Sequence, residues 1–404
     1  MAEVITKREQ QFNKQQEELE RDVALKKEED NLPPANIMVA GITGTGKSTL
    51  INAVFGEQMA KTGSGRPVTE HIDEYHDENV PIHIWDTVGL ELDSQKTRES
   101  IKSIKSTIAA KSSSNNMYDR VHAIWYCINS GSNRYQGAEL EFIKELHSIG
   151  VPFIIVLTQC SGDEDETNEF ENEIKKINIS MEMVDIKIVQ VLAAPVKYRG
   201  MPEAIPAFGL EELVNTTLTL LPNFIKSGFI AAQRVSQSEK RIASEEIICE
   251  YVRKAQNGFW DKVPLVNVFL TDKNIINMFK KLGEMYNTVL SEDAISTITD
   301  SCGVDFKNNF FGLINPIYRE YSGKITDLLK EKEEDGFSVQ VKDVKKNNRA
   351  ARMIAFFGYT FIDSVEELWR NSTDKELRDV DKVVATLINI INKRLKERNG
   401  KFRG

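Results

Sequence analysis

Residues 41–49, with the sequence GITGTGKST, constrain the fold of this chain more than any other feature. They match the pattern G-x-x-x-x-G-K-[ST], in which glycines let backbone amides surround a phosphate group. The apolar run IMVA precedes the motif, and STLINAVFG, which is typical of a helix start, follows it. A strand, a glycine-rich loop and a helix in this order create an anion site at the helix N-terminus. The sequence therefore predicts a triphosphate-binding loop.

Short apolar runs alternate with longer helical periods from residue 36 to about residue 224, which predicts an α/β domain. The predicted strands are 37–42, 71–76, 82–86, 122–128, 153–158 and 186–192. The predicted helices are 47–56, 95–110, 135–149, 165–178 and 209–221. This order predicts a P-loop G domain with a six-stranded, mostly parallel sheet that helices cover on both faces.

The rest of the chain is predicted to be helical, so we expect three parts: a charged helix over 1–32, the P-loop domain over 33–224 and a helical domain over 225–404. Apolar residues recur every seventh position in the first part, but for too few heptads to require a coiled coil. A helix docked on the protein is the simpler interpretation, and a homodimer is the alternative. The C-terminal helices are predicted at 229–257, 272–290, 292–301, 350–370 and 375–397.

Composition excludes several classes of protein. The formal net charge of −9 argues against a domain built to neutralise nucleic-acid phosphates, so no nucleic-acid partner is expected. The four cysteines lie far apart, without the spacing of a zinc site or a disulfide framework. The charged N-terminal segment has no apolar stretch of the signal-peptide kind, and no apolar window is long enough to span a membrane. We therefore expect a cytoplasmic protein.

Three further positions complete the predicted phosphate and metal site. Lys47 is expected to reach the β- and γ-phosphates, and the Ser48 hydroxyl to bind Mg²⁺. Asp86 begins the segment DTVG at the end of an apolar strand, where open parallel sheets bind ligands. We expect Asp86 to hold Mg²⁺ and the Gly89 amide to meet the γ-phosphate. Thr69, in the polar loop 63–69, is the candidate second hydroxyl ligand of Mg²⁺, unless it is only a turn residue.

The segments GITGTGKSTLIN, RPVT and DTVG, together with the strand order, resemble the Ras-like P-loop GTPases. The resemblance covers residues 36–224 and is greatest to the Era-like and septin-like branch of translation-factor-related GTPases. It implies GTP binding and hydrolysis, Mg²⁺ as cofactor, two switch loops, and Lys47, Thr69 and Gly89 as the residues that serve hydrolysis. It also implies nucleotide contacts along the whole loop, from Gly41, Thr43, Gly44, Thr45, Gly46, Lys47, Ser48 and Thr49.

The base-recognition segment departs from the family pattern N/T-K-x-D. This chain has TQCS at residues 158–161, so the aspartate that pairs with guanine is absent from its position. Thr158 and Gln159 approximate the first two positions, and Asp163 can replace the aspartate only if the loop bulges. Ala193 and Ala194 fit the position where family members contact the base through backbone amides. A preference for GTP is therefore expected, with use of ATP as the alternative.

A second departure concerns hydrolysis. Leu90 follows DTVG, where many relatives have a glutamine that orients the attacking water. Because Mg²⁺, the P-loop lysine and backbone amides carry most of phosphoryl transfer, we expect hydrolysis at a slow intrinsic rate.

Three functions fit the sequence. The first is a nucleotide-dependent switch that binds GTP or GDP and acts on a protein effector. The second is a membrane-associated, self-assembling GTPase of the dynamin-like or immunity-related kind. The basic residues near the C-terminus leave peripheral contact with anionic lipids open, although they also complement the helix dipole. The third is a nucleotide-gated binding module with negligible turnover.

Overall fold

A computed structural model describes most of the chain. The described residues are 32–56, 59–62, 66–69, 72–77, 80–87, 94–112, 116–132, 135, 138–257, 273–288, 290–299 and 349–401. The helix predicted at the N-terminus lies outside them, except for Leu32.

A seven-stranded sheet forms the centre of the N-terminal half, with the order β2-β3-β4-β1-β5-β6-β7. Its strands are β1 (Ala35–Gly41), β2 (Arg66–Thr69), β3 (Ile72–Asp77), β4 (Val80–Thr87), β5 (Ala123–Asn129), β6 (Phe153–Thr158) and β7 (Lys187–Gln190). Five strands are parallel, and β3 joins β4 and β2 through antiparallel pairings. All six predicted strands are present, so the predicted α/β fold with a mostly parallel sheet is confirmed.

The seventh strand, β2, corrects the prediction of a continuous polar loop over 63–69. Its residues Arg66, Pro67 and Thr69 pair with β3 at the edge of the sheet. Proline cannot donate a backbone hydrogen bond and is therefore tolerated in edge strands. A strand at the edge of a sheet can be polar, so β2 lacks the apolar pattern from which the other strands were predicted.

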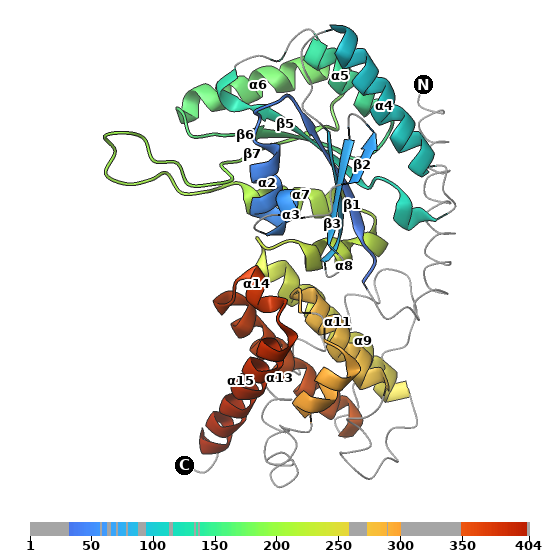
Figure 1. Cartoon of the computed structure of the whole chain (residues 1–404), viewed down its shortest axis with the longest axis vertical. Helices are drawn as coiled ribbons and strands as arrows, with labels where there is room; N and C mark the ends of the chain where they lie inside the picture. Colours follow the sequence, from blue (N-terminus) through green and yellow to red (C-terminus); the bar gives the residue numbers. More distant parts are fainter. Residues whose placement is uncertain are drawn as a thin grey trace.

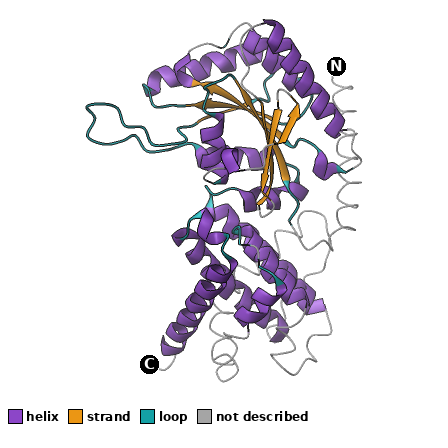
Figure 2. Ribbon diagram, viewed as in Figure 1, coloured by secondary structure: helices purple, strands orange, loops and turns teal. Residues whose placement is uncertain are grey.

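Helices cover both faces of the sheet (Figures 1 and 2). Alternate residues of β1 show the division: Met38 and Ala40 face one core cluster, and Ile37 and Val39 face the other. The first face is covered by α4 (Ser94–Ser112), α5 (Ala138–His147) and α6 (Glu164–Ser180). The second is covered by α2 (Lys47–Phe55), α3 (Met59–Thr62), α7 (Leu210–Leu220) and α8 (Asn223–Ala232).

Helices alone make up the described residues after α8, as the sequence predicted. They are α9 (Gln237–Asn257), α11 (Lys273–Met285), a helix at 292–299, α13 (Arg349–Asn371), α14 (Asp374–Leu377) and α15 (Val380–Lys401). Their apolar side chains continue the core cluster beneath the second face of the sheet. Of the described helices, none combines the length and the apolar character that crossing a membrane demands.

The helix predicted over 229–257 is interrupted, and this prediction was wrong at the break between α8 and α9. The side-chain oxygen of Gln233 accepts hydrogen bonds from the amides of Val235 and Ser236, both at 2.7 Å. The amide of Arg234 donates to the carbonyl of Val54 in α2 at 2.7 Å. These bonds replace helical ones, because a side chain that satisfies nearby amides competes with helix formation.

Candidate nucleotide-binding site

The loop between β1 and α2 has the conformation that its glycines predicted. Gly41, Gly44 and Gly46 all have positive φ angles, of 146°, 84° and 83°. At Gly41 space is the second constraint, because a Cβ atom would lie 2.5 Å from the carbonyl oxygen of Cys127 in β5. The hydroxyl of Thr45 donates to the carbonyl of Ile42 at 2.8 Å and holds the loop closed on itself. The backbone is therefore shaped to wrap a small anion.

The P-loop lysine lies against the inside of this loop. The Lys47 ammonium donates to the carbonyl oxygens of Gly41 at 3.0 Å and Ile42 at 3.4 Å, and the residue is 8% exposed. Gly46 caps α2 without a side-chain hydrogen bond, so among the described residues no N-cap side chain satisfies the first-turn amides. A positive helix end and a cation thus converge on one point. Ser48 and Thr49 in the first turn, and Thr43 in the loop, are exposed.

Asp86 lies beside the loop as predicted, at the end of β4. It pairs in register with Val39 of the neighbouring strand β1. One carboxylate oxygen, Oδ1, is buried without a hydrogen-bond partner among the described residues. Burial raises the pKa of Asp86 to about 6, the nearby Lys47 opposes this rise, and Asp73 adds to it.

These features of Asp86 fit a divalent cation. A buried carboxylate oxygen that lacks a donor is stabilised by a bound cation, and carboxylate and hydroxyl oxygens are the ligands that Mg²⁺ prefers. Ser48, an exposed residue in the first turn of α2, supplies a hydroxyl directly after the P-loop lysine. The donor set of Ser48 and Asp86 therefore suits Mg²⁺.

The remaining phosphate-site predictions are tested less fully. Thr69 ends β2, next to Ile72 of β3, but its side chain lies outside the described residues. Gly89 and Leu90 also lie outside them. Their roles stay predictions.

The base-recognition segment follows β6 and contacts the P-loop directly. The buried hydroxyl of Thr158 lies 2.6 Å from the carbonyl oxygen of Thr45 and 3.1 Å from that of Ile128. Gln159 has a left-handed backbone, with φ of 56°, and its side-chain amide donates to the carbonyl of Gly44 at 2.8 Å. Both residues therefore help to fix the position of the P-loop.

Asp163 has a structural role in this segment. Its Oδ1 accepts hydrogen bonds from the amides of Asp165 and Glu166, at 2.9 and 3.2 Å, and so caps the N-terminus of α6. Such a cap stabilises a helix by about 1 kcal/mol, which explains the aspartate without a ligand. Its predicted contact with a base stays untested.

Ala193 and Ala194 follow β7 at the same sheet edge. They come after Leu192, which forms an isolated bridge with Phe208. Ala193 is half-buried and Ala194 is exposed. The loop that begins here projects away from the sheet, in yellow-green between β7 and α7 in Figure 1.

Two residues of this region were missed by sequence reasoning. Asn129, at the end of β5, donates from its side-chain amide to the Gln159 side-chain oxygen at 3.2 Å. Tyr198, in the projecting loop, has its hydroxyl 2.7 Å from the hydroxyl of Ser161. Asn129 had a signal, because it ends a strand next to the P-loop strand. Tyr198 had none, because only the path of the loop brings it back to Ser161.

Comparison with known proteins gives a family match over part of this region. Residues 36–159 match the family model described as 50S ribosome-binding GTPase. A search among curated proteins finds no match.

Three solved structures are among the matches. A bacterial selenocysteine-specific elongation factor, EF-Sec, is 19% identical, and the match covers 47% of this chain and 29% of that one, with a TM-score of 0.31. Translation elongation factor SelB from Methanococcus maripaludis, in complex with a GTP analogue, is 16% identical over 47% of this chain and 35% of that one, with a TM-score of 0.31. The apo form of the same factor is 16% identical over 48% of this chain and 34% of that one, with a TM-score of 0.31. The chain thus spans about a third of these elongation factors.

Proposed function

We propose that this chain, whose residues 36–159 form a P-loop GTPase domain, binds GTP and hydrolyses it slowly as a switch that acts through its helical half. One observation carries the proposal. The Lys47 ammonium is held on the carbonyl oxygens of the glycine loop that leads into α2, and the N-cap of this helix, Gly46, makes no side-chain hydrogen bond. Amides, helix dipole and ammonium together favour a polyphosphate over a neutral ligand.

The residues divide the work of binding. Backbone amides from Gly41 to Gly46 and the Lys47 ammonium would hold the β- and γ-phosphates. Ser48, Asp86 and Thr69 would hold Mg²⁺, which supplies charge compensation on the phosphate oxygens when it is bound. The Gly89 amide would contact the γ-phosphate. With Leu90 in the position of a water-orienting glutamine, the intrinsic rate of hydrolysis is expected to be low.

Three contacts between the two halves support a switch. Helix α8 packs on β1 and β4, and a Cβ atom on its Gly228 would lie 1.8 Å from the carbonyl oxygen of Pro33. The amide of Arg234 bonds Val54 at the end of the P-loop helix. Arg378, after α14, forms an ion pair of 2.6 Å with Asp77.

The pair between Arg378 and Asp77 is the contact best placed to transmit the nucleotide state. Asp77 ends β3, at the turn of the hairpin that β3 and β4 form. Thr69 precedes this hairpin in the chain, Asp86 lies near the end of β4, and Gly89 follows β4. A shift of either loop toward a γ-phosphate would therefore move a hairpin that the helical half holds at its tip.

The test compares nucleotide binding and turnover in two variants. Isothermal titration calorimetry with Mg²⁺ should show binding of GTP by the native chain and its loss in Lys47→Ala. The control Lys105→Ala, which removes a partly exposed lysine of α4, should bind normally. Phosphate release should then show slow multiple turnover. Absence of GTP binding by the native chain contradicts the proposal, and binding without any turnover leaves only a nucleotide-gated module.

A further inference from the structure

The loops after β6 and β7 meet through a pair of hydroxyl groups beside the P-loop. Ser161 lies two residues after Gln159, whose side-chain amide donates to the carbonyl of Gly44. Ser161 is therefore close to the rim of the phosphate loop. Its hydroxyl lies 2.7 Å from that of Tyr198. The amide of Cys160 donates to the carbonyl of Val191 at 3.3 Å and joins the two loops a second time. Two hydrogen bonds therefore join the loops after β6 and β7 at this rim.

The loop that carries Tyr198 is held in shape near its base. Leu192 and Phe208 exchange two backbone hydrogen bonds of 3.1 Å, and Val196 and Ile205 exchange bonds of 3.1 and 2.9 Å. Tyr198 stands two residues beyond Val196 and is 43% exposed. Its hydroxyl is thus presented from a paired segment, and its ring is partly open to solvent.

The one carboxylate in the described segment 158–163 is committed to a helix cap through one of its oxygens. In residues 158–163 the single acidic side chain is Asp163, which uses Oδ1 to cap α6. Ser161 occupies the position where the resemblance to Ras-like GTPases implies an aspartate. A neutral hydroxyl pair therefore stands in the place of a charged acceptor.

The difference matters for the choice of base. An ionised carboxylate only accepts hydrogen bonds, so it matches the two donors of guanine, N1–H and the N2 amino group, and repels the unprotonated N1 of adenine. A hydroxyl group both donates and accepts, so it can satisfy either purine.

We propose that Ser161 and Tyr198 form the base-recognition edge of this site and that the site discriminates weakly between guanine and adenine nucleotides. This inference rests on the proposed function, because it concerns the base of the same bound triphosphate.

The experiment measures dissociation constants of Mg²⁺-GTP and Mg²⁺-ATP for the full chain by calorimetry. The native chain should prefer GTP by less than about tenfold. Ser161→Asp should increase the preference for GTP over ATP, measured as the ratio of the ATP to the GTP dissociation constant, by at least about tenfold. A hydrogen bond to a charged group is worth about 1.5–3 kcal/mol, and each 1.4 kcal/mol is about tenfold in affinity. Tyr198→Phe, which keeps the ring, should weaken both nucleotides to a similar extent. Ser106→Asp, on an exposed position of α4, is the control for added charge and should change nothing.

The outcomes separate this inference from the proposed function. Exclusion of ATP by more than about a hundredfold in the native chain overturns the inference and leaves the GTPase intact. An unchanged ratio in folded Ser161→Asp removes Ser161 from the recognition edge, and an unchanged affinity in Tyr198→Phe removes Tyr198. Thermal denaturation of each variant establishes that it is folded. If the native chain binds neither nucleotide, the proposed function itself fails.

Discussion

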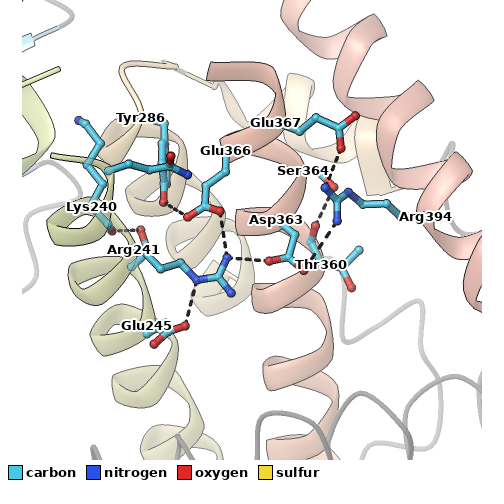
Figure 3. Close-up of polar contacts among 12 residues, drawn as sticks. Lys240, Arg241, Glu245, Tyr286, Thr360, Asp363, Ser364, Glu366, Glu367 and Arg394 are labelled. Atoms are coloured by element: carbon cyan, nitrogen blue, oxygen red, sulfur yellow. Dashed lines mark hydrogen bonds and ion pairs between the residues drawn. The ribbon is translucent and has the colours of Figure 1, made fainter. Parts of the chain in front are cut away.

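Arg241 is paired with three carboxylates in the described part of the helical half, and its removal gives a stability prediction that can be worked out from the structure. Figure 3 shows its guanidinium between α9 and α13. It donates to Glu245 at 2.9 Å, Asp363 at 2.6 Å and Glu366 at 3.2 Å. The Arg241 side chain is 21% exposed, and its partners are between 9% and 13% exposed. Its loss would leave three carboxylates close together in a mostly buried place.

Arg241→Met should lower the free energy of unfolding by about 3 kcal/mol. Breaking a buried ion pair from one side costs about 3–5 kcal/mol, because the remaining charge stays desolvated. We take the lower end because other partners remain. Glu366 still accepts from the Tyr286 hydroxyl at 2.9 Å, and Arg394 lies 3.9 Å from Asp363. Methionine replaces most of the apolar stem of arginine, so little packing is lost.

Urea denaturation followed by circular dichroism measures this change. The matched control is Lys254→Met in the same helix, where a pair with Glu250 is 49% and 39% exposed and should matter by less than about 1 kcal/mol. Adding Glu366→Gln to Arg241→Met should recover part of the loss, because it removes one unpaired charge and keeps an acceptor for Tyr286. If Arg241→Met costs no more than Lys254→Met, or the double variant is less stable still, the electrostatic reasoning is wrong.

Three further predictions use other parts of the molecule. Burial raises the pKa of Glu139 from 4.5 to about 7, an effect that its hydrogen bond from Tyr126 only partly offsets. The folded state therefore retains a proton that the unfolded state loses above pH 4.5, so the stability that Glu139 contributes is lost as the pH rises through 7. Between pH 5.5 and 8, urea denaturation should show the native chain losing about 2 kcal/mol of unfolding free energy relative to Glu139→Gln. Equal pH profiles of the two proteins would refute this. Arg378→Ala should lower the free energy of unfolding by less than about 1 kcal/mol, since Arg378 is 47% exposed in its pair with Asp77, and a loss above about 2 kcal/mol would contradict this. Gly41→Ala should strain the phosphate loop by about 1–3 kcal/mol, because the φ of 146° at this position suits glycine and the new Cβ would meet a backbone oxygen. Calorimetry should then show weaker GTP binding. Unchanged affinity would disprove the close approach.

The core strands and the phosphate loop could be predicted from local sequence. The central strands β1 and β6 are buried along their whole length, so each appears as a mostly apolar run, and the glycines of the loop are needed for positive φ angles. Asp163 had a local signal that was interpreted differently. An aspartate followed three residues later by Glu166 is typical of a helix N-terminus, and that is the role it has here.

Contacts between distant segments were decided only by the tertiary structure. Ser161 and Tyr198 are separated by 37 residues, and Arg234 bonds Val54 of α2, which lies far away in the sequence. The break after α8 and the edge strand β2 likewise depend on partners elsewhere in the chain. Sequence periodicity reports which face of an element is apolar, and motif spacing reports which backbone shape a loop can take. Which polar groups then meet depends on how the elements pack, and hydrogen bonds between distant residues leave no periodic trace in the sequence.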